Sequence, residues 1–113
     1  MITKGPDHSL AVYTRDAFNE RAAKVVAGSR NNAEARAFIR IFVAGTDEQH
    51  PDSQGRITIG PEHREWARLT KDCKVIGAIN SLEIWDAAAW DSYSGAHAES
   101  FSDADNEVFE GMV

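Results

Sequence analysis

Ser81-Leu82-Glu83-Ile84-Trp85, followed by Trp90, repeats the pattern of Ser9-Leu10-Ala11-Val12-Tyr13, followed by Phe18, at a constant offset of 72 residues. The β-branched and aromatic side chains of the later copy are typical of a β-strand, which predicts a strand in the earlier copy as well. Each copy of such a repeat is a unit that cannot bury its own apolar face and needs its neighbour. The sequence therefore predicts a fold built from two similar halves.

The two copies are unequal in length. The later copy is preceded by Asp52-Ser53-Gln54-Gly55-Arg56-Ile57-Thr58-Ile59, whereas its counterpart in the earlier copy would begin at 52 − 72 = −20, before Met1. We therefore expect the first repeat to be incomplete. A strand that lacks its pairing partner leaves an edge that frays or recruits other chains. A chain extended upstream by a half-repeat is accordingly expected to be more stable and less prone to associate.

Four segments follow from this unequal repeat. They are the C-terminal part of the first repeat with its helix (1–28), a linking helix (29–46), a complete second repeat (47–93) and an acidic, flexible tail (94–113). The tail is expected to be flexible because small, acidic and serine residues prevail in it. With 113 residues, 42% of them apolar, the chain has the size of one small domain or of two small fused units.

Composition narrows the classes of function. No stretch approaches the roughly 18 apolar residues of a membrane span, and the N-terminus lacks the apolar run of a secretory signal. We therefore expect a cytoplasmic protein without a membrane partner. Cys73 is the only cysteine, which excludes an intrachain disulfide and a thiolate metal cluster, and we expect its side chain to be buried.

The histidines do not predict an enzyme. They stand at His8, His50, His63 and His97, without the spacing of metal ligands, and no nucleophile lies in a recognisable motif. We expect no metal, no cofactor and no small-molecule substrate. His63 could approach a phosphate group, but a solvated histidine is the favoured interpretation.

Charge is distributed unevenly along the chain. The net charge is −6, and residues 95–113 hold five acidic residues without any Lys or Arg, so the remainder carries only −1. The basic residues of the remainder fall in two windows, Arg21, Lys24, Arg30, Arg36 and Arg40, and Arg56, Arg64, Arg68, Lys71 and Lys74. Either window could be a solvated face. The nearly neutral body nevertheless leaves a nucleic-acid partner possible, because phosphate binding draws on Lys and Arg.

Short strands and helices alternate along the chain. We expect strands at 10–13, 56–59, 74–79 and 82–85, the third of them central in its sheet, and helices from Thr14 to Gly28, from Asn31 or Asn32 to Gly45, over 62–68 and over 87–90. The two long helices are separated by only a few polar residues and should fold back as a hairpin. Ala35, Phe38, Ile39, Phe42 and Val43 have the spacing of a buried stripe on the second helix.

The repeated aromatic residues predict the core. Tyr13, Phe18, Trp85 and Trp90 lie at matching positions of the two copies, and large aromatic side chains dominate small cores. Together with the strand pattern they predict an α+β fold, a small β-barrel made from two similar halves that a helical hairpin joins. Trp66 and Leu69 are the expected buried contacts of the short helix after Gly60-Pro61.

The loop from Asp52 to Arg56 carries the functional signal. Gly55 can take a positive φ without steric cost, and Asp52 can accept hydrogen bonds from turn amides, so the loop should be stiff. It would present Arg56 at the start of a strand, where the planar guanidinium fits phosphate oxygens or the edge of guanine in two-point contact. The alternative is structural, because Asp-x-x-Gly-Arg is a common way to build a turn in which the arginine simply pairs with the aspartate.

The wider segment resembles a known family. Asp52 to Leu69, followed by Val75-Ile76-Gly77 and by Leu82-Glu83-Ile84-Trp85-Asp86 with Trp90, closely resembles the MraZ family of bacterial transcriptional regulators. The resemblance runs from Ile2 to Tyr93. It implies two fused SpoVT/AbrB-like units in a swapped or split β-barrel, assembled into rings. Such rings would bind short direct repeats of double-stranded DNA upstream of the division and cell-wall gene cluster and act on its transcription.

The resemblance also implies roles for individual residues. Full-length members carry two Asp-x-x-x-Arg signatures, and this sequence has only the second, at Asp52 and Arg56. We expect Arg56 to be the reader of bases or phosphate, with Ser53 and Gln54 as its loop neighbours and with Asp52 and Gly55 structuring the loop. The candidate contacts to the DNA backbone are Arg64, Arg68, Lys71 or Lys74. A ring would multiply weak contacts by avidity, and the protein would be nucleoid-associated. The alternative is an oligomerisation or interaction module that does not bind DNA by itself.

Overall fold

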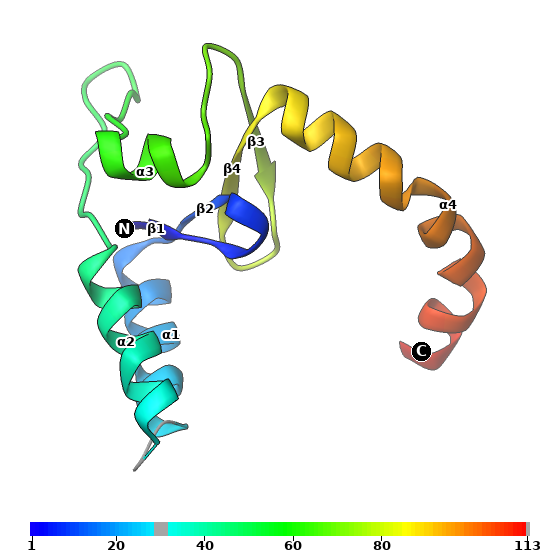
Figure 1. Ribbon diagram of the computed structural model, residues 1–113, viewed down its shortest axis with the longest axis horizontal. Coiled ribbons are helices and arrows are strands. Elements are labelled where there is room, and N and C mark those ends of the chain that lie inside the picture. The colour runs from blue at the N-terminus through cyan, green and yellow to red at the C-terminus, as the bar shows by residue number, and fades with distance from the viewer. Residues whose placement is uncertain (29–31, 113) are drawn as a thin grey trace.

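The computed structural model describes residues 1–28 and 32–112, with side chains described as far as Asp103. One antiparallel sheet, with strand order β1-β2-β4-β3, forms its centre (Figure 1). Helices α1 and α2 extend together from one side of the sheet, and α4 leads away on another (Figure 1). The elements are β1 (Ile2–Lys4), the 3-10 helix η1 (Pro6–His8), β2 (Leu10–Val12), α1 (Arg15–Ala27), α2 (Ala33–Ala44), α3 (Pro61–Trp66), β3 (Cys73–Gly77), β4 (Leu82–Asp86) and α4 (Ala87–Met112).

The two middle strands are the ones that the repeat in sequence relates. Ala11 of β2 lies opposite Glu83 of β4, and these residues occupy the same position of the repeat. The outer strands break this symmetry, because Lys4 lies opposite Leu10 whereas its counterpart Ile76 lies opposite Glu83. A shift of one residue in register turns every side chain of a strand to the other face of the sheet. β1 and β3 therefore present equivalent residues to opposite faces.

The third strand lies at an edge of the sheet. The sequence predicts a central strand over 74–79, but β3 ends at Gly77 and, among the described residues, pairs with β4 alone. Val75 is 57% exposed, and Cys73 is exposed, so the expectation of a buried cysteine is wrong. The apolar run identified a strand correctly. It could not show whether a second strand would lie beside it, because an apolar side chain is compatible with either place.

The sheet is open among the described residues. It confirms a mixed fold of helices and antiparallel strands, which is the α+β class that the sequence predicts. A closed or split barrel of two SpoVT/AbrB-like repeats, the first incomplete, goes beyond these four strands and stays a prediction.

The ends of α1 and α2 follow the capping signals in the sequence. The Thr14 hydroxyl accepts a hydrogen bond from the Ala17 amide at 3.1 Å, and the Asn32 side chain accepts one from the Glu34 amide at 2.9 Å. A side-chain oxygen at this position satisfies an amide that has no partner within the helix. The alternative cap, Asn31, lies outside the described residues.

Aromatic stacking holds the helical hairpin together. The rings of Phe18 on α1 and Phe42 on α2 stack with their centroids 5.3 Å apart, and Phe38 stacks on Phe42 at 6.1 Å. The buried stripe expected on α2 is not observed, because no residue of α2 is fully buried. Ala35, Ile39 and Phe42 are half-buried, and Phe38 and Val43 remain 53% and 56% exposed. Helical periodicity identified the apolar face, but among the described residues α1 and β1 cover only part of it.

Aliphatic residues rather than the repeated aromatic ones form the centre of the core. The buried cluster consists of Ile2, Leu10, Ala67 and Ile84, with Val12, Ile59, Trp66 and Leu69 packed against it. Of the four aromatic residues expected there, Phe18 and Trp85 are buried, whereas Tyr13 and Trp90 are only half-buried. The aromatic residues pair with each other, Tyr13 with Phe18 and Trp85 with Trp90, where α1 and α4 leave the sheet.

The C-terminal segment is helical. The sequence predicts one helical turn to Trp90 and an irregular tail from 94, but α4 runs as far as Met112. Trp90, Tyr93 and His97 are spaced as neighbours on one helix face. The centroid of the Tyr93 ring lies 4.8 Å from that of Trp85 and 4.5 Å from that of His97. These contacts stabilise the first turns of α4, beyond the single helical turn that the sequence predicts. No helix in the part of the chain that is described is long and apolar enough to cross a membrane.

Asp86 joins the end of the sheet to the segment after α3. Its carboxylate accepts hydrogen bonds from the Thr70 hydroxyl at 2.5 Å, from the Thr70 amide at 3.1 Å and from the Ala89 amide at 3.1 Å. These donors favour the charged form, and they hold the pKa of Asp86 below its usual value, with the Thr70 hydroxyl contributing most. Asp86 thus caps α4 and anchors the chain that leaves α3.

We expect Asp86→Asn to lower the melting temperature at pH 7, because an amide offers one acceptor where the carboxylate offers two. A carboxylate whose pKa is lowered by folding stabilises the folded state above its unfolded pKa, and loses that effect as the pH falls through the folded pKa. The difference between the two proteins should therefore shrink below about pH 4. Thermal melts followed by circular dichroism over pH 2–8 measure this, with the exposed Asp91→Asn as control. Equal melting temperatures at pH 7 would contradict the role.

Candidate nucleic-acid interface

The loop that starts at Asp52 is closed by its own hydrogen bonds. The Gly55 amide donates to the Asp52 carbonyl at 2.9 Å, and the Asp52 amide donates to the Arg56 carbonyl at 2.9 Å. One carboxylate oxygen of Asp52 accepts from the amides of Gln54 at 2.9 Å and Arg56 at 2.8 Å. Gly55 has φ +77°, a conformation that side chains with a Cβ rarely adopt. Backbone bonds and one aspartate thus define the shape of the loop.

The charge on Asp52 is part of this closure. Hydrogen bonding lowers the pKa of Asp52, mainly through the Arg56 amide and further through the Arg56 guanidinium and the Gln54 amide. The carboxylate therefore stays ionised well below neutral pH, and the loop keeps its acceptor throughout the physiological range.

Arg56 pairs with Asp52 and remains exposed. Its Nε donates to the second carboxylate oxygen of Asp52 at 2.9 Å, while 71% of the Arg56 side chain is exposed to solvent. Both interpretations of the motif therefore describe part of what is seen. Because the contact uses Nε, the two terminal amino groups of the guanidinium remain available for a ligand, and no hydrogen bond from them is recorded within the described ranges. The ion pair orients the side chain rather than burying it.

The residues after the loop do not form the expected strand. Residues 56–59 have no ladder partner in the part of the chain that the structure describes, although Ile59 packs against the core. Alternation of apolar and polar residues predicts which side chains face inward. A strand also needs a neighbouring strand edge. In the part of the chain with described positions, the outer side of β1 forms a single bridge, between Ile2 and Asp47.

The other candidate residues lie around this loop and α3. Ser53 and Gln54 are exposed at the loop turn, and Arg64 is exposed on α3. Arg68 follows the helix with φ +52° and is also exposed. It lines a depression whose other walls are Lys4, His8, Glu62, Glu65 and Trp66. Two of these neighbours are acidic, which makes Arg68 a weaker candidate for phosphate than Arg64.

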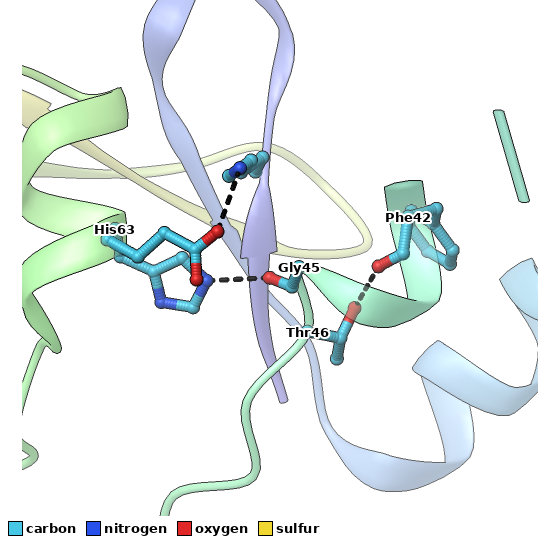
Figure 2. A network of polar contacts seen from close by, with 6 residues as sticks. Phe42, Gly45, Thr46 and His63 are labelled. Carbon is cyan, nitrogen blue, oxygen red and sulfur yellow. Dashed lines mark hydrogen bonds and ion pairs between the residues drawn. The ribbon is translucent and has the colours of Figure 1, made fainter. Parts of the chain in front are cut away.

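His63 is a structural residue that sequence reasoning missed. We expected it in solvent, but only 6% of it is exposed, and its Nε2 lies 2.6 Å from the Gly45 carbonyl oxygen (Figure 2). The signal was present in the helical spacing, because Trp66 and Ala67 follow at i+3 and i+4 and also face the core. The described residues contain no group of three His, Cys, Asp or Glu side chains arranged to hold a metal ion.

Comparison with known proteins places the chain in a family. The family model described as "MraZ protein, putative antitoxin-like" matches residues 42–111, which is more than half of the chain. A protein of Mycolicibacterium smegmatis named "Transcriptional regulator MraZ" is 55% identical over 113 residues, covering 100% of this chain and 79% of that protein. Proteins of the same name from Mycobacterium tuberculosis and Mycobacterium ulcerans are 59% identical over 108 residues, covering 96% of this chain and 76% of theirs.

The fold and the site together define a small α+β protein that displays an arginine on a hydrogen-bonded surface loop. The chain belongs to the MraZ family. This membership confirms the resemblance of Asp52 to Leu69 and of the later strands to that family, and it agrees with the expectation that the protein is not an enzyme.

We expect Gly55→Ala to destabilise the protein more than Gly60→Ala does. A Cβ at either position would have no atom within 4 Å, so the two differ mainly in backbone, with φ +77° at Gly55 and −67° at Gly60. The left-handed conformation costs a residue with a Cβ on the order of 1 kcal/mol, which lowers the melting temperature of a small domain by roughly 4 °C. Differential scanning calorimetry measures both variants. Equal effects would show that the conformation of Gly55 does not limit the loop.

Proposed function

We propose that this chain is a sequence-specific DNA-binding regulator of transcription. It would act in the cytoplasm, at the nucleoid, on spaced direct repeats in the promoter of a division and cell-wall gene cluster. The observation that supports this most is the Arg56 side chain, 71% exposed on a loop whose shape does not depend on a ligand. The names of the mycobacterial relatives agree with it.

Restraint of Arg56 favours binding. A free arginine loses rotamer entropy when it binds, whereas here the Nε–Asp52 contact has already restricted the side chain. The planar guanidinium can then offer two parallel hydrogen bonds to a guanine edge or to a phosphate group. Ser53 and Gln54 lie in the same turn and would contact the adjacent backbone or bases. Arg64 would contact a phosphate group, and Arg68 would contribute less.

One such loop is a weak binding site for a protein with a net charge of −6. We propose that a ring of subunits supplies the affinity, because repeated loops on spaced repeats make each later contact intramolecular. The unit that carries the loop would be the second repeat, residues 47–93, with residues 1–28 as part of the first repeat and 29–46 as the helix that links the two. The partners are then double-stranded DNA and further copies of the chain, with no membrane and no small-molecule substrate.

The second candidate function is an interaction module that does not bind DNA by itself. Exposed apolar side chains favour it, since Phe38 and Ile41 on α2 and Val75 on the edge strand β3 are all more than half exposed. An edge strand of this kind can pair with another chain. The two candidate functions differ in whether an assembly of this chain, without any other protein, binds DNA.

We expect Arg56→Ala to weaken binding to a duplex from the region upstream of the chain's own gene by about tenfold or more, the loss typical of one two-point base contact. The melting temperature should not change, because the backbone hydrogen bonds of the loop do not use this side chain and an exposed ion pair contributes little. Fluorescence anisotropy at stated salt, against a shuffled duplex, measures the affinity.

The exposed Arg36→Ala on α2 is the control for loss of one positive charge. Equal losses in the two variants would indicate unspecific electrostatics. Loss of folding in Arg56→Ala would return Arg56 to a structural role. Absence of binding by the unmodified chain, together with stable self-association, would support the interaction module instead.

A further inference from the structure

We infer that His63 is a positioning residue that holds α3, and with it Arg64, in the orientation needed for DNA contact. This inference rests on the proposed function. It assigns a role to a residue that lies away from the DNA-facing loop and that acts through its neighbour in the chain.

The first observation is the buried hydrogen bond of His63. Its Nε2 lies 2.6 Å from the Gly45 carbonyl oxygen, and both residues are buried. Because a carbonyl oxygen only accepts, Nε2 carries the proton and donates it. Gly45 follows the last residue of α2, where carbonyl groups lack partners within the helix. The bond therefore satisfies the end of one helix with a side chain of another.

A second bond at the same helix end serves as a comparison. The Thr46 hydroxyl donates to the Phe42 carbonyl at 2.5 Å, so it closes α2 upon itself (Figure 2). The His63 bond instead links residues 18 positions apart, from α3 to α2 (Figure 2). Loss of either bond weakens the end of α2, but only loss of the His63 bond releases α3.

Other contacts cannot replace His63 at this position. Lys4 Nζ lies 3.4 Å from the Glu62 carboxylate, but the Glu62 side chain is 76% exposed, and exposed ion pairs contribute little. The Trp66 indole donates to the Ser9 carbonyl at 3.0 Å and fixes the other end of α3. His63 is thus the buried side-chain anchor of the half of the helix that begins next to the loop.

The short length of α3 makes the anchor necessary. Residues 61–66 form barely two turns, and so short a helix is not stable by itself in water. Its direction is therefore set by tertiary contacts. Arg64 is the next residue, exposed while His63 is buried, so a rotation of the helix that releases His63 also redirects Arg64.

The test combines His63→Leu with Arg64→Ala in a double-mutant cycle. The measurement is the affinity for the duplex from the chain's own upstream region at several salt concentrations. Each phosphate contact contributes about 0.9 to the slope of log K against log salt. We expect His63→Leu and Arg64→Ala to lower this slope by the same amount, and the double variant to lower it no further.

Two further variants separate positioning from general stability. His63→Gln keeps an N–H donor at a similar reach and should restore the slope. Thr46→Val should lower the melting temperature but keep the slope. If the losses in the cycle add, or if Thr46→Val reproduces the effect of His63→Leu on the slope, the inference is overturned. His63→Asn, which is polar but too short to reach Gly45, replaces His63→Leu should the latter not fold.

Amide hydrogen exchange without DNA tests the anchor independently of the proposed function. The Arg64 and Ala67 amides donate to the Gly60 and His63 carbonyls, both at 3.0 Å. These two amides should exchange on the order of tenfold faster in His63→Leu than in the unmodified chain. In Thr46→Val their exchange rates should not change. If the unmodified chain binds no DNA, the proposed function fails, and with it the role assigned to His63. If the unmodified chain binds DNA but the exchange rates in His63→Leu are unchanged, the role assigned to His63 is overturned and the proposed function is not.

Discussion

The pairing of β2 with β4 is the constraint on which the rest of the structure depends. It joins Leu10–Val12 to Leu82–Ile84 and so closes most of the chain into one loop. Everything between these strands must return to them, which places α3 on the core face through the contact of Ala67 with the cluster around Leu10. The entropy lost in closing so long a loop has to be offset by this burial. The Asp52–Arg56 loop is carried to the surface as a consequence.

The short helix α3 is where core and surface meet. One side of it contributes His63 and Trp66 to packing, with Ala67 directly after the helix, and the other side exposes Arg64. A six-residue helix has little stability of its own, so the contacts beneath it set its orientation. The direction in which Arg64 is exposed therefore depends on the buried residues beneath the helix.

Charge separation along the chain has a structural counterpart. The acidic residues after residue 94 belong to α4, which leaves the sheet on a different side from α1 and α2 (Figure 1). Interactions between exposed charges are screened beyond about 10 Å in ordinary salt. The acidic residues of α4 therefore have little effect on the positive charge of the basic side chains near the loop. A net charge of −6 describes the whole chain and not the face that carries Arg56.

Local signals in the sequence determined the α+β class, the caps at Thr14 and Asn32 and the positive φ of Gly55, because each depends on residues only a few positions away. Only the tertiary structure decided which strand lies at the edge and that His63 is buried against Gly45. It also decided that 56–59 remains without a strand partner among the described residues. These outcomes depend on segments far apart in the chain, and periodicity shows which way a side chain faces but not what it meets.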